Sequence, residues 1–267
     1  MIAMQQRKLF WYFGAKTALI DDIIKLVAPL YSTGRITAFV DVFGGAGNVL
    51  LNVPLEWKVN RIYNDIDSRL YNLMLDLKDE KKRNLLFENL FWSLSSKQLF
   101  NDFKTKEQND SFEFLYRIFN SFNCDTGSYG VRITDVREPY NSQLNLLKRN
   151  WRYIQKWNAE CLDFEDLIKK YDSPTTFFYF DPPYLTGGKN YKYIFEIKDF
   201  ERLKNAINNM KGFYLMNESE RDFDAIKKIF GEPNFVKKYV NHVNTNRNQL
   251  KSKNRKQYRL EGYWYNF

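Results

Sequence analysis

Asp181, Pro182, Pro183 and Tyr184 are the residues whose order points most clearly to chemistry. They follow a run of strand-forming aromatic residues, FFYF at 177–180. The two prolines end the strand and carry no N–H group, so the tip presents acceptors, namely the Asp181 carboxylate and the Pro182 carbonyl oxygen. Tyr184 adds an aromatic face. A flat ring bearing an amino group, such as a nucleobase, fits this combination; an ordinary turn after a buried strand is the alternative.

Two such acceptors would help the amino nitrogen of a base to act as a nucleophile. Its lone pair is normally delocalised into the ring, but acceptors that hold its hydrogens favour a pyramidal nitrogen whose lone pair is free. If that nitrogen attacks the methyl group of a sulfonium, the Asp181 carboxylate stabilises the positive charge that develops. Proximity of the two reactants supplies much of the rest. This chemistry needs no general base of tuned pKa, which suits a chain with a single histidine, His242.

A glycine cluster, Gly44, Gly45 and Gly47, follows the apolar run AFVDVF at 38–43. Glycine permits close approach of the backbone to a ligand at the carboxyl edge of a sheet. The cluster lacks the third glycine of the dinucleotide fingerprint, and no G-K-[ST] of a phosphate-binding loop follows. Asp65 ends the next predicted strand, where its carboxylate could accept both hydroxyls of a ribose. Together these residues predict an adenosine-containing ligand, and a glycine-rich turn without a ligand is the alternative.

Three zones of the chain would position these residues. Residues 1–67 alternate strand and helix in the pattern of the first half of a doubly wound α/β fold. Residues 70–150 are mainly helical, with a polar loop at 123–142, and are interpreted as an inserted subdomain. The α/β alternation then resumes, with strands predicted to end near residues 180, 217 and 267 of one continued sheet.

The composition narrows the class of protein. Lys and Arg outnumber Asp and Glu by 41 to 32, which gives a net charge of +9. This surplus suggests a polyanionic partner, and a basic surface that serves only solubility is an equal alternative. The two cysteines, Cys124 and Cys161, are too few and too far apart for a zinc site or a disulfide framework, so no metal is expected. No segment has the features of a membrane span or a signal peptide, and we expect an intracellular, cytoplasmic protein.

On these residues the chain resembles the DNA adenine N6-methyltransferases of the Dam and DpnM type, the α-ordered group of S-adenosylmethionine (AdoMet)-dependent amino-methyltransferases. The matching segments, in family order, are YFGAK, FVDVFGGAGNVLLN, YNDID, DFEDL, DPPY and LEGYWYNF. The resemblance implies a Rossmann-like class I methyltransferase sheet with helices on both faces. Residues 1–69 and 151–267 would form the catalytic domain, and 70–150 a mainly helical target-recognition subdomain.

The resemblance also implies a role for each matching residue. Asp181, Pro182, Pro183 and Tyr184 would form the catalytic motif, in which Asp181 and Pro182 accept from the target amino group and Tyr184 stacks on a base flipped out of double-stranded DNA. The residues expected around AdoMet are Tyr12, Lys16, Phe43, Gly44, Gly45, Gly47, Asp65, Ile66, Phe164 and Asp181.

The expected recognition loop departs from the family pattern. In FNSFNCDTGSYGVRITDVREPYN, Cys124 replaces an expected glycine and no clear R-x-N is present, so a GATC target is not supported. The candidate DNA-binding residues are Asn123, Tyr129, Arg132 and Arg137. The two arginines are expected either to contact bases or phosphates of the DNA, or to be ordinary surface charges. The basic stretch at 244–259 either binds phosphates or is a solvated loop.

Several questions stay open at this point. The same acceptors suit an RNA adenine or cytosine N4, and a relative that has lost catalysis would keep only nucleic-acid binding. Double-stranded DNA is the expected partner. A cognate restriction endonuclease is a candidate partner whose existence the sequence does not decide.

Overall fold

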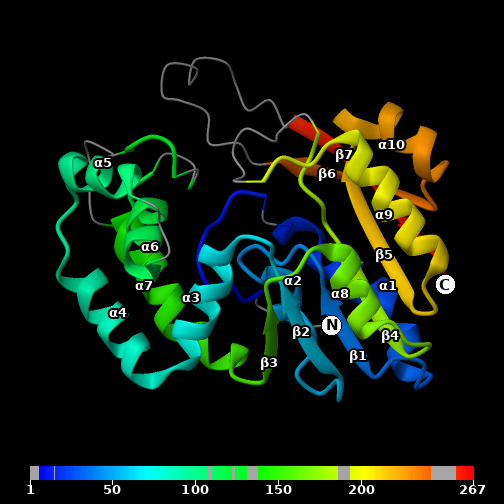
Figure 1. Ribbon diagram of the computed structural model, residues 1–267, viewed down its shortest axis with the longest axis horizontal. Coiled ribbons are helices and arrows are strands. Elements are labelled where there is room, and N and C mark those ends of the chain that lie inside the picture. The colour runs from blue at the N-terminus through cyan, green and yellow to red at the C-terminus, as the bar shows by residue number, and fades with distance from the viewer. Residues whose placement is uncertain are drawn as a thin grey trace.

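The computed structural model describes residues 6–14, 16–106, 110–121, 124, 126–130, 138–185, 193–241 and 257–267. Its centre is a seven-stranded sheet with the strand order β3-β2-β1-β4-β5-β7-β6 (Figure 1). The strands are β1 (Ala38–Asp41), β2 (Asn60–Asn64), β3 (Trp157–Glu160), β4 (Thr176–Phe180), β5 (Phe213–Ser219), β6 (Phe235–Asn241) and β7 (Gln257–Tyr265). The expected mixed α/β sheet is confirmed.

The strand order places a switch point between β1 and β4. From β1 the chain continues to β2 and β3 on one side, then returns to β4 and β5 on the other, and all these neighbours pair in parallel. β7 pairs antiparallel with both β5 and β6. In open α/β sheets the crevice at the carboxyl ends of the switch-point strands is the usual ligand site. The ends of β1 and β4 are the positions that carry Asp41 and Asp181.

Helices cover both faces of the sheet, because its central strands are apolar on both sides. On one face, Phe39, Phe177 and Tyr179 belong to the same hydrophobic cluster as the buried residues of α1 (Ile20–Ser32), α2 (Asn48–Asn52) and α3 (Ser68–Lys78). On the other face, Val40 and Phe178 pack with α8 (Phe164–Tyr171), α9 (Ile197–Asn209) and α10 (Phe223–Phe230). Strand residues that alternate along β1 and β4 therefore divide between two cores.

A helical block lies beyond the β3 edge of the sheet (Figure 1). It contains α4 (Glu80–Trp92), α5 (Lys97–Thr105), α6 (Ser111–Phe119) and α7 (Glu138–Asn150). Asp79 separates α3 from α4, because its side chain accepts from the backbone N–H of Lys82 and caps the second helix. The buried residues of the block continue the cluster formed by α1, α2 and α3. The helical block thus shares a core with one face of the sheet.

Three segments differ from the sequence-based expectation. Residues 235–241 form β6, an edge strand that was not predicted. The last strand begins at Gln257 rather than near Leu260, so the end of the basic stretch 244–259 is sheet rather than loop. α7 begins at Glu138, within the predicted polar loop.

Short 3₁₀ helices occupy Thr17–Leu19, Trp151–Ile154 and Glu220–Asp222. Among the described residues, no helix combines the length and apolarity that crossing a membrane requires.

Candidate active site

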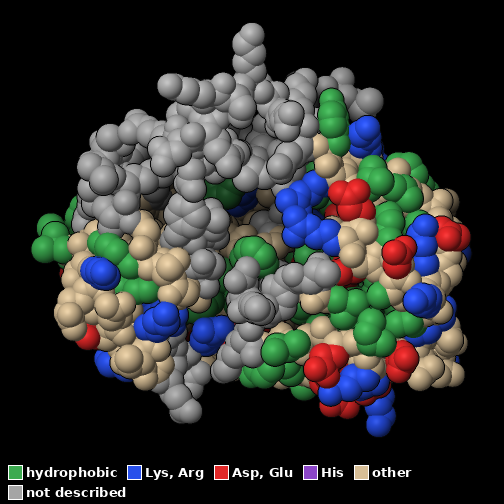
Figure 2. Space-filling view, turned by 90° about the horizontal axis from the view of Figure 1, so that it is seen from above, with side chains coloured by type: hydrophobic (Ala, Val, Ile, Leu, Met, Phe, Trp, Pro, Cys, Tyr) green, Lys and Arg blue, Asp and Glu red, His purple; other side chains and the backbone are tan. Residues whose placement is uncertain are grey.

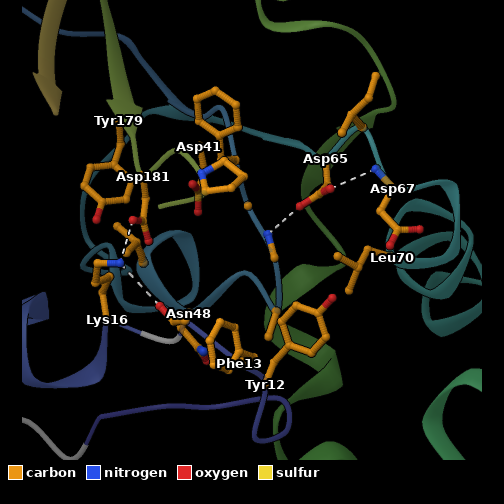
Figure 3. Close-up of a pocket in the computed structure, with 18 of the residues that line it drawn as sticks. Tyr12, Phe13, Lys16, Asp41, Asn48, Asp65, Asp67, Leu70, Tyr179 and Asp181 are labelled. Atoms are coloured by element: carbon orange, nitrogen blue, oxygen red, sulfur yellow. Dashed lines mark hydrogen bonds and ion pairs between the residues drawn. The ribbon is translucent and has the colours of Figure 1, made fainter. Parts of the chain in front are cut away.

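A pocket opens at the switch point and joins the glycine turn to the end of β4 (Figure 3). The two strand ends are held side by side, since Asp41 is the register partner of Tyr179 and the N–H of Val42 donates to the Tyr179 carbonyl over 3.1 Å. Among the predicted residues, the pocket is lined by Tyr12, Lys16, Phe43, Gly44, Gly45, Asp65, Ile66, Asp181 and Pro183. Tyr12 and Pro183, which are 171 positions apart in the chain, thus share one cavity.

The three glycines of the turn meet different requirements. A Cβ atom on Gly44 would overlap the ring of Tyr63, and one on Gly47 would lie 2.9 Å from the Trp157 ring. These two glycines therefore allow close packing of the turn on the sheet. Gly45 has φ +53° and faces the pocket, where only the ring of Tyr12 lies near its missing side chain, at 3.7 Å. Close approach to a ligand is thus a reason for glycine at position 45.

Asp65 is fixed by hydrogen bonds from two backbone amides. Its Oδ2 accepts from the N–H of Gly45 and its Oδ1 from the N–H of Asp67, each over 2.8 Å (Figure 3). Burial raises the pKa of Asp65 to about 6, although both hydrogen bonds favour the charged form. Each oxygen keeps a lone pair that can accept from a ligand hydroxyl.

Asp41 and Asn48 are pocket residues that were not predicted. Asp41 is buried at the end of β1, and burial, with a smaller contribution from Asp181, raises its pKa to about 8. The Oδ1 atom of Asn48 is buried and accepts no hydrogen bond from the residues that the structure describes. The sequence carries a signal for both residues, an acid inside an apolar strand and an amide directly after the last glycine of the turn. Both present oxygen acceptors to the pocket, so they suit a cationic or N–H-bearing group.

Lys16 forms an ion pair with Asp181. Its Nζ lies 2.6 Å from Asp181 Oδ1 (Figure 3). The same Nζ lies 4.5 Å from the centre of the Tyr184 ring. Burial alone would lower the pKa of Lys16, but nearby groups, Asp181 foremost, raise it well above its ordinary value. Lys16 therefore contacts the predicted catalytic motif directly. The resemblance places Lys16 near AdoMet but does not predict this contact.

A buried polar network holds the motif from behind. Asn217 on β5 donates from Nδ2 to Glu261 Oε1 over 2.7 Å, and its own Oδ1 accepts from the hydroxyl of Tyr179. The hydroxyl of Tyr184 donates to the same Glu261 oxygen over 3.3 Å. The Tyr184 ring is therefore held by Glu261 on one side and lies against Lys16 on the other.

Some predicted residues lie outside the pocket lining. Phe164 is buried behind Phe43, with ring centres 6.0 Å apart, so it supports the wall rather than forming it. Gly47, Pro182 and Tyr184 are likewise not lining residues, although each neighbours one. The pocket also includes Phe13 and Tyr193, which were not predicted. Among the described residues, no cluster of His, Cys, Asp and Glu is arranged to hold a metal ion.

The candidate DNA-binding residues are mostly outside the described residues. This applies to Asn123, Arg132, Arg137 and to His242 and the first part of the basic stretch. Tyr129 lies in the helical block, where its hydroxyl is 3.0 Å from that of Ser95. On the described part of the upper face, basic and acidic side chains are mixed at the right, whereas mostly basic ones lie at the left, over the helical block (Figure 2).

Comparison with known proteins gives two matches. Residues 12–245 match the model of a family described as D12 class N6 adenine-specific DNA methyltransferase. The chain is also similar to the type II methyltransferase M.MjaIII of Methanocaldococcus jannaschii, with 25% identity over 275 residues that cover 89% of this chain and 92% of that protein. The family match spans both the glycine turn and the end of β4.

Proposed function

The chain belongs to the D12 class N6 adenine-specific DNA methyltransferases, and from this premise we propose that it transfers a methyl group from AdoMet to N6 of an adenine flipped out of double-stranded DNA. The observation that carries the proposal is the continuity of the pocket from Gly45 and Asp65 to Asp181. A cosubstrate at the glycine turn and an amino group at Asp181 would then lie in one cavity, where proximity lowers the barrier.

The pocket residues fit AdoMet. The Asp65 carboxylate suits the ribose hydroxyls, while Asp41 and the unpartnered Asn48 oxygen suit the cationic methionine end. Phe43 and Ile66 offer apolar surface to the adenine ring, and Gly45 leaves room for the backbone to approach. When bound, AdoMet supplies an electrophilic methyl group on a sulfonium.

Asp181 and Tyr184 would handle the target base. The Asp181 carboxylate accepts an N6 hydrogen and stabilises the charge that develops on nitrogen, together with the Pro182 carbonyl. Stacking on Tyr184 offsets part of the cost of unstacking the base from the duplex, which is about a few kcal/mol. Residues 70–150, with Asn123, Tyr129, Arg132 and Arg137, would select the target sequence.

The test is to incubate the protein with labelled AdoMet and unmethylated duplex DNA and to digest the product to nucleosides. We expect the label in N6-methyladenine; label confined to cytosine, or transfer only to RNA, would defeat the substrate assignment. Asp181→Ala should abolish turnover while leaving AdoMet binding partly intact. Asp110→Ala is the control, because that carboxylate accepts from the backbone amides of Phe112 and Glu113 and lies outside the pocket.

Cytosine N4 is the second candidate target, because it presents the same pair of N–H donors to Asp181. The family match favours adenine. The type II name of the relative supports a role beside a restriction endonuclease. Methylome sequencing of an expressing host tests the target base and its sequence context together.

A further inference from the structure

Among the described residues, the Lys16 ammonium interacts with three carboxyl groups in and behind the pocket lining. Asp181 on the tip after β4, Glu261 on β7 and Glu218 on β5 all lie within its electrostatic influence. The side chains of Glu218 and Glu261 are almost completely buried. A buried carboxylate without a cation costs several kcal/mol, so one ammonium cannot support three ionised groups. Local contacts decide which carboxyl group keeps its charge.

The contacts assign the ammonium to Asp181. Lys16 Nζ touches Asp181 at 2.6 Å, whereas Glu261 Oε1 is held by the neutral donors Asn217 and Tyr184. Glu218 Oε1 accepts from the N–H of Ser219 over 3.0 Å, and within the described part of the chain its Oε2 has no donor. Burial raises the pKa of Glu261 and raises that of Glu218 well above its ordinary value, so burial favours the neutral form of Glu218 in particular.

We propose that Lys16 is a positioning residue that keeps Asp181 ionised, so that the carboxylate accepts a hydrogen from the target amino group. The inference rests on the proposed function, because an ionised acceptor is required there only if an amino group binds. A protonated Asp181 would present an O–H to the N–H donors and could not stabilise a positive nitrogen. Burial raises the pKa of Asp181, and the Lys16 ammonium opposes that rise.

The direction of the effect follows from the charged or titratable groups that interact with Asp181 among the described residues, namely Lys16, Asp41, Tyr179, Tyr184, Glu218, Tyr239 and Glu261. All of these except Lys16 are acids, so each opposes ionisation of Asp181 when it is itself charged. Loss of Lys16 therefore raises the pKa of Asp181. Since removal of an adjacent opposite charge moves a carboxyl pKa by about 1–3 units, the acid limb of kcat should move by that amount.

The experiment compares Lys16→Gln, Lys16→Arg and the control Lys170→Gln, which breaks a 2.7 Å ion pair with Glu160 outside the pocket. Methyl transfer to duplex DNA is measured from about pH 5.5 to 9 at saturating AdoMet, and AdoMet affinity is measured separately by calorimetry. We expect K16Q to shift the acid limb upward by about one unit or more, with at least about tenfold lower kcat on that limb. K16R and K170Q should keep the wild-type limb.

An unchanged limb in K16Q, with only AdoMet affinity reduced, would overturn the proposal and leave Lys16 as a cosubstrate ligand. Failure of the wild type to methylate adenine would instead refute the proposed function, so the two failures are distinguishable.

If methyl transfer by K16Q is too slow to measure, the pH dependence of its unfolding free energy tests the same proposal. Without Lys16, the pKa of Asp181 in the folded protein would lie well above its value in the unfolded chain. The folded protein would therefore bind this proton more tightly than the unfolded chain does. The unfolding free energy of K16Q should then fall more steeply with rising pH than that of wild type, from about pH 4 upward. In an Asp181→Asn background this extra slope should vanish. Parallel curves for K16Q and K16Q/D181N would contradict the proposal without any activity assay.

Discussion

The carboxylate of Asp65 lies 2.8 Å from the amide nitrogen of Gly45 and so fastens the end of β2 to the turn that follows β1. Removing it affects the ligand and the turn together. We expect Asp65→Ala to weaken AdoMet binding about 10- to 100-fold, because hydrogen bonds to a charged group are worth about 1.5–3 kcal/mol. Calorimetry gives the dissociation constant. Asp110→Ala should lower stability with no change in AdoMet affinity; equal affinities for D65A and wild type would refute the ribose role.

Asp41 should make folding less favourable as pH rises. Its folded pKa of about 8 lies above the ordinary value of 3.8, so the folded protein binds the proton more tightly than the unfolded chain does. Its contribution to stability is therefore full below about pH 4 and declines up to about pH 8, with a slope of about 1.4 kcal/mol per pH unit at most. Urea unfolding across this range tests the slope, which Asp41→Asn should reduce. If D41N leaves the slope unchanged, another group causes it.

Gly47 and Gly34 form a matched pair for testing the packing of the turn. Both have a left-handed backbone, with φ +70° and +71°, but an added Cβ meets the Trp157 ring at 2.9 Å only at position 47. Gly34→Ala should cost about 1 kcal/mol through backbone strain alone. Gly47→Ala should cost about 1–3 kcal/mol more from overpacking and should also weaken AdoMet binding. Chemical denaturation of both variants gives the difference in their unfolding free energies. Equal losses of stability would show that the Trp157 ring moves aside without a measurable loss of free energy.

Tyr184 should act through its ring more than through its hydroxyl. Its hydrogen bond to Glu261 is long, at 3.3 Å, so Tyr184→Phe should keep activity within a few-fold of wild type. Tyr184→Ala removes the stacking surface, worth about 1–3 kcal/mol per base, and should lower kcat/KM for DNA about 5- to 150-fold. Steady-state kinetics on duplex DNA provides the comparison. A fully active Y184A would eliminate the stacking role.

The strand ends were predictable because their signals are local. Each strand is an apolar run that ends at a residue type that interrupts a strand. FVDVF is followed by the glycines, and FFYF is followed by Asp181 and two prolines, so the end of each strand can be located from the sequence. Parallel pairing of β1 with β4 then brings those ends together without further information. The pocket between Gly45 and Asp181 could therefore be anticipated from the order of the motifs.

Contacts that depend on side-chain direction could not be predicted. The Lys16–Asp181 ion pair joins residues 165 positions apart, and no local pattern specifies it. β6 was missed because FVKKYVN carries two lysines in its middle, as edge strands often do, and its pairing with β7 is a tertiary property. Asp41 has an ordinary residue type, and only its burial makes its pKa unusual.

The shared core of the helical block and the sheet limits how this enzyme can be re-engineered. Buried residues of α3, α4, α6 and α7 belong to one continuous cluster with Phe39 and Phe177 of the central strands. A chimera that exchanged all of residues 70–150 for a foreign counterpart would cut through this cluster and expose apolar surface on both halves. New target specificity is better sought by grafting the connections between these helices, such as residues 120–137, which leaves the shared core intact.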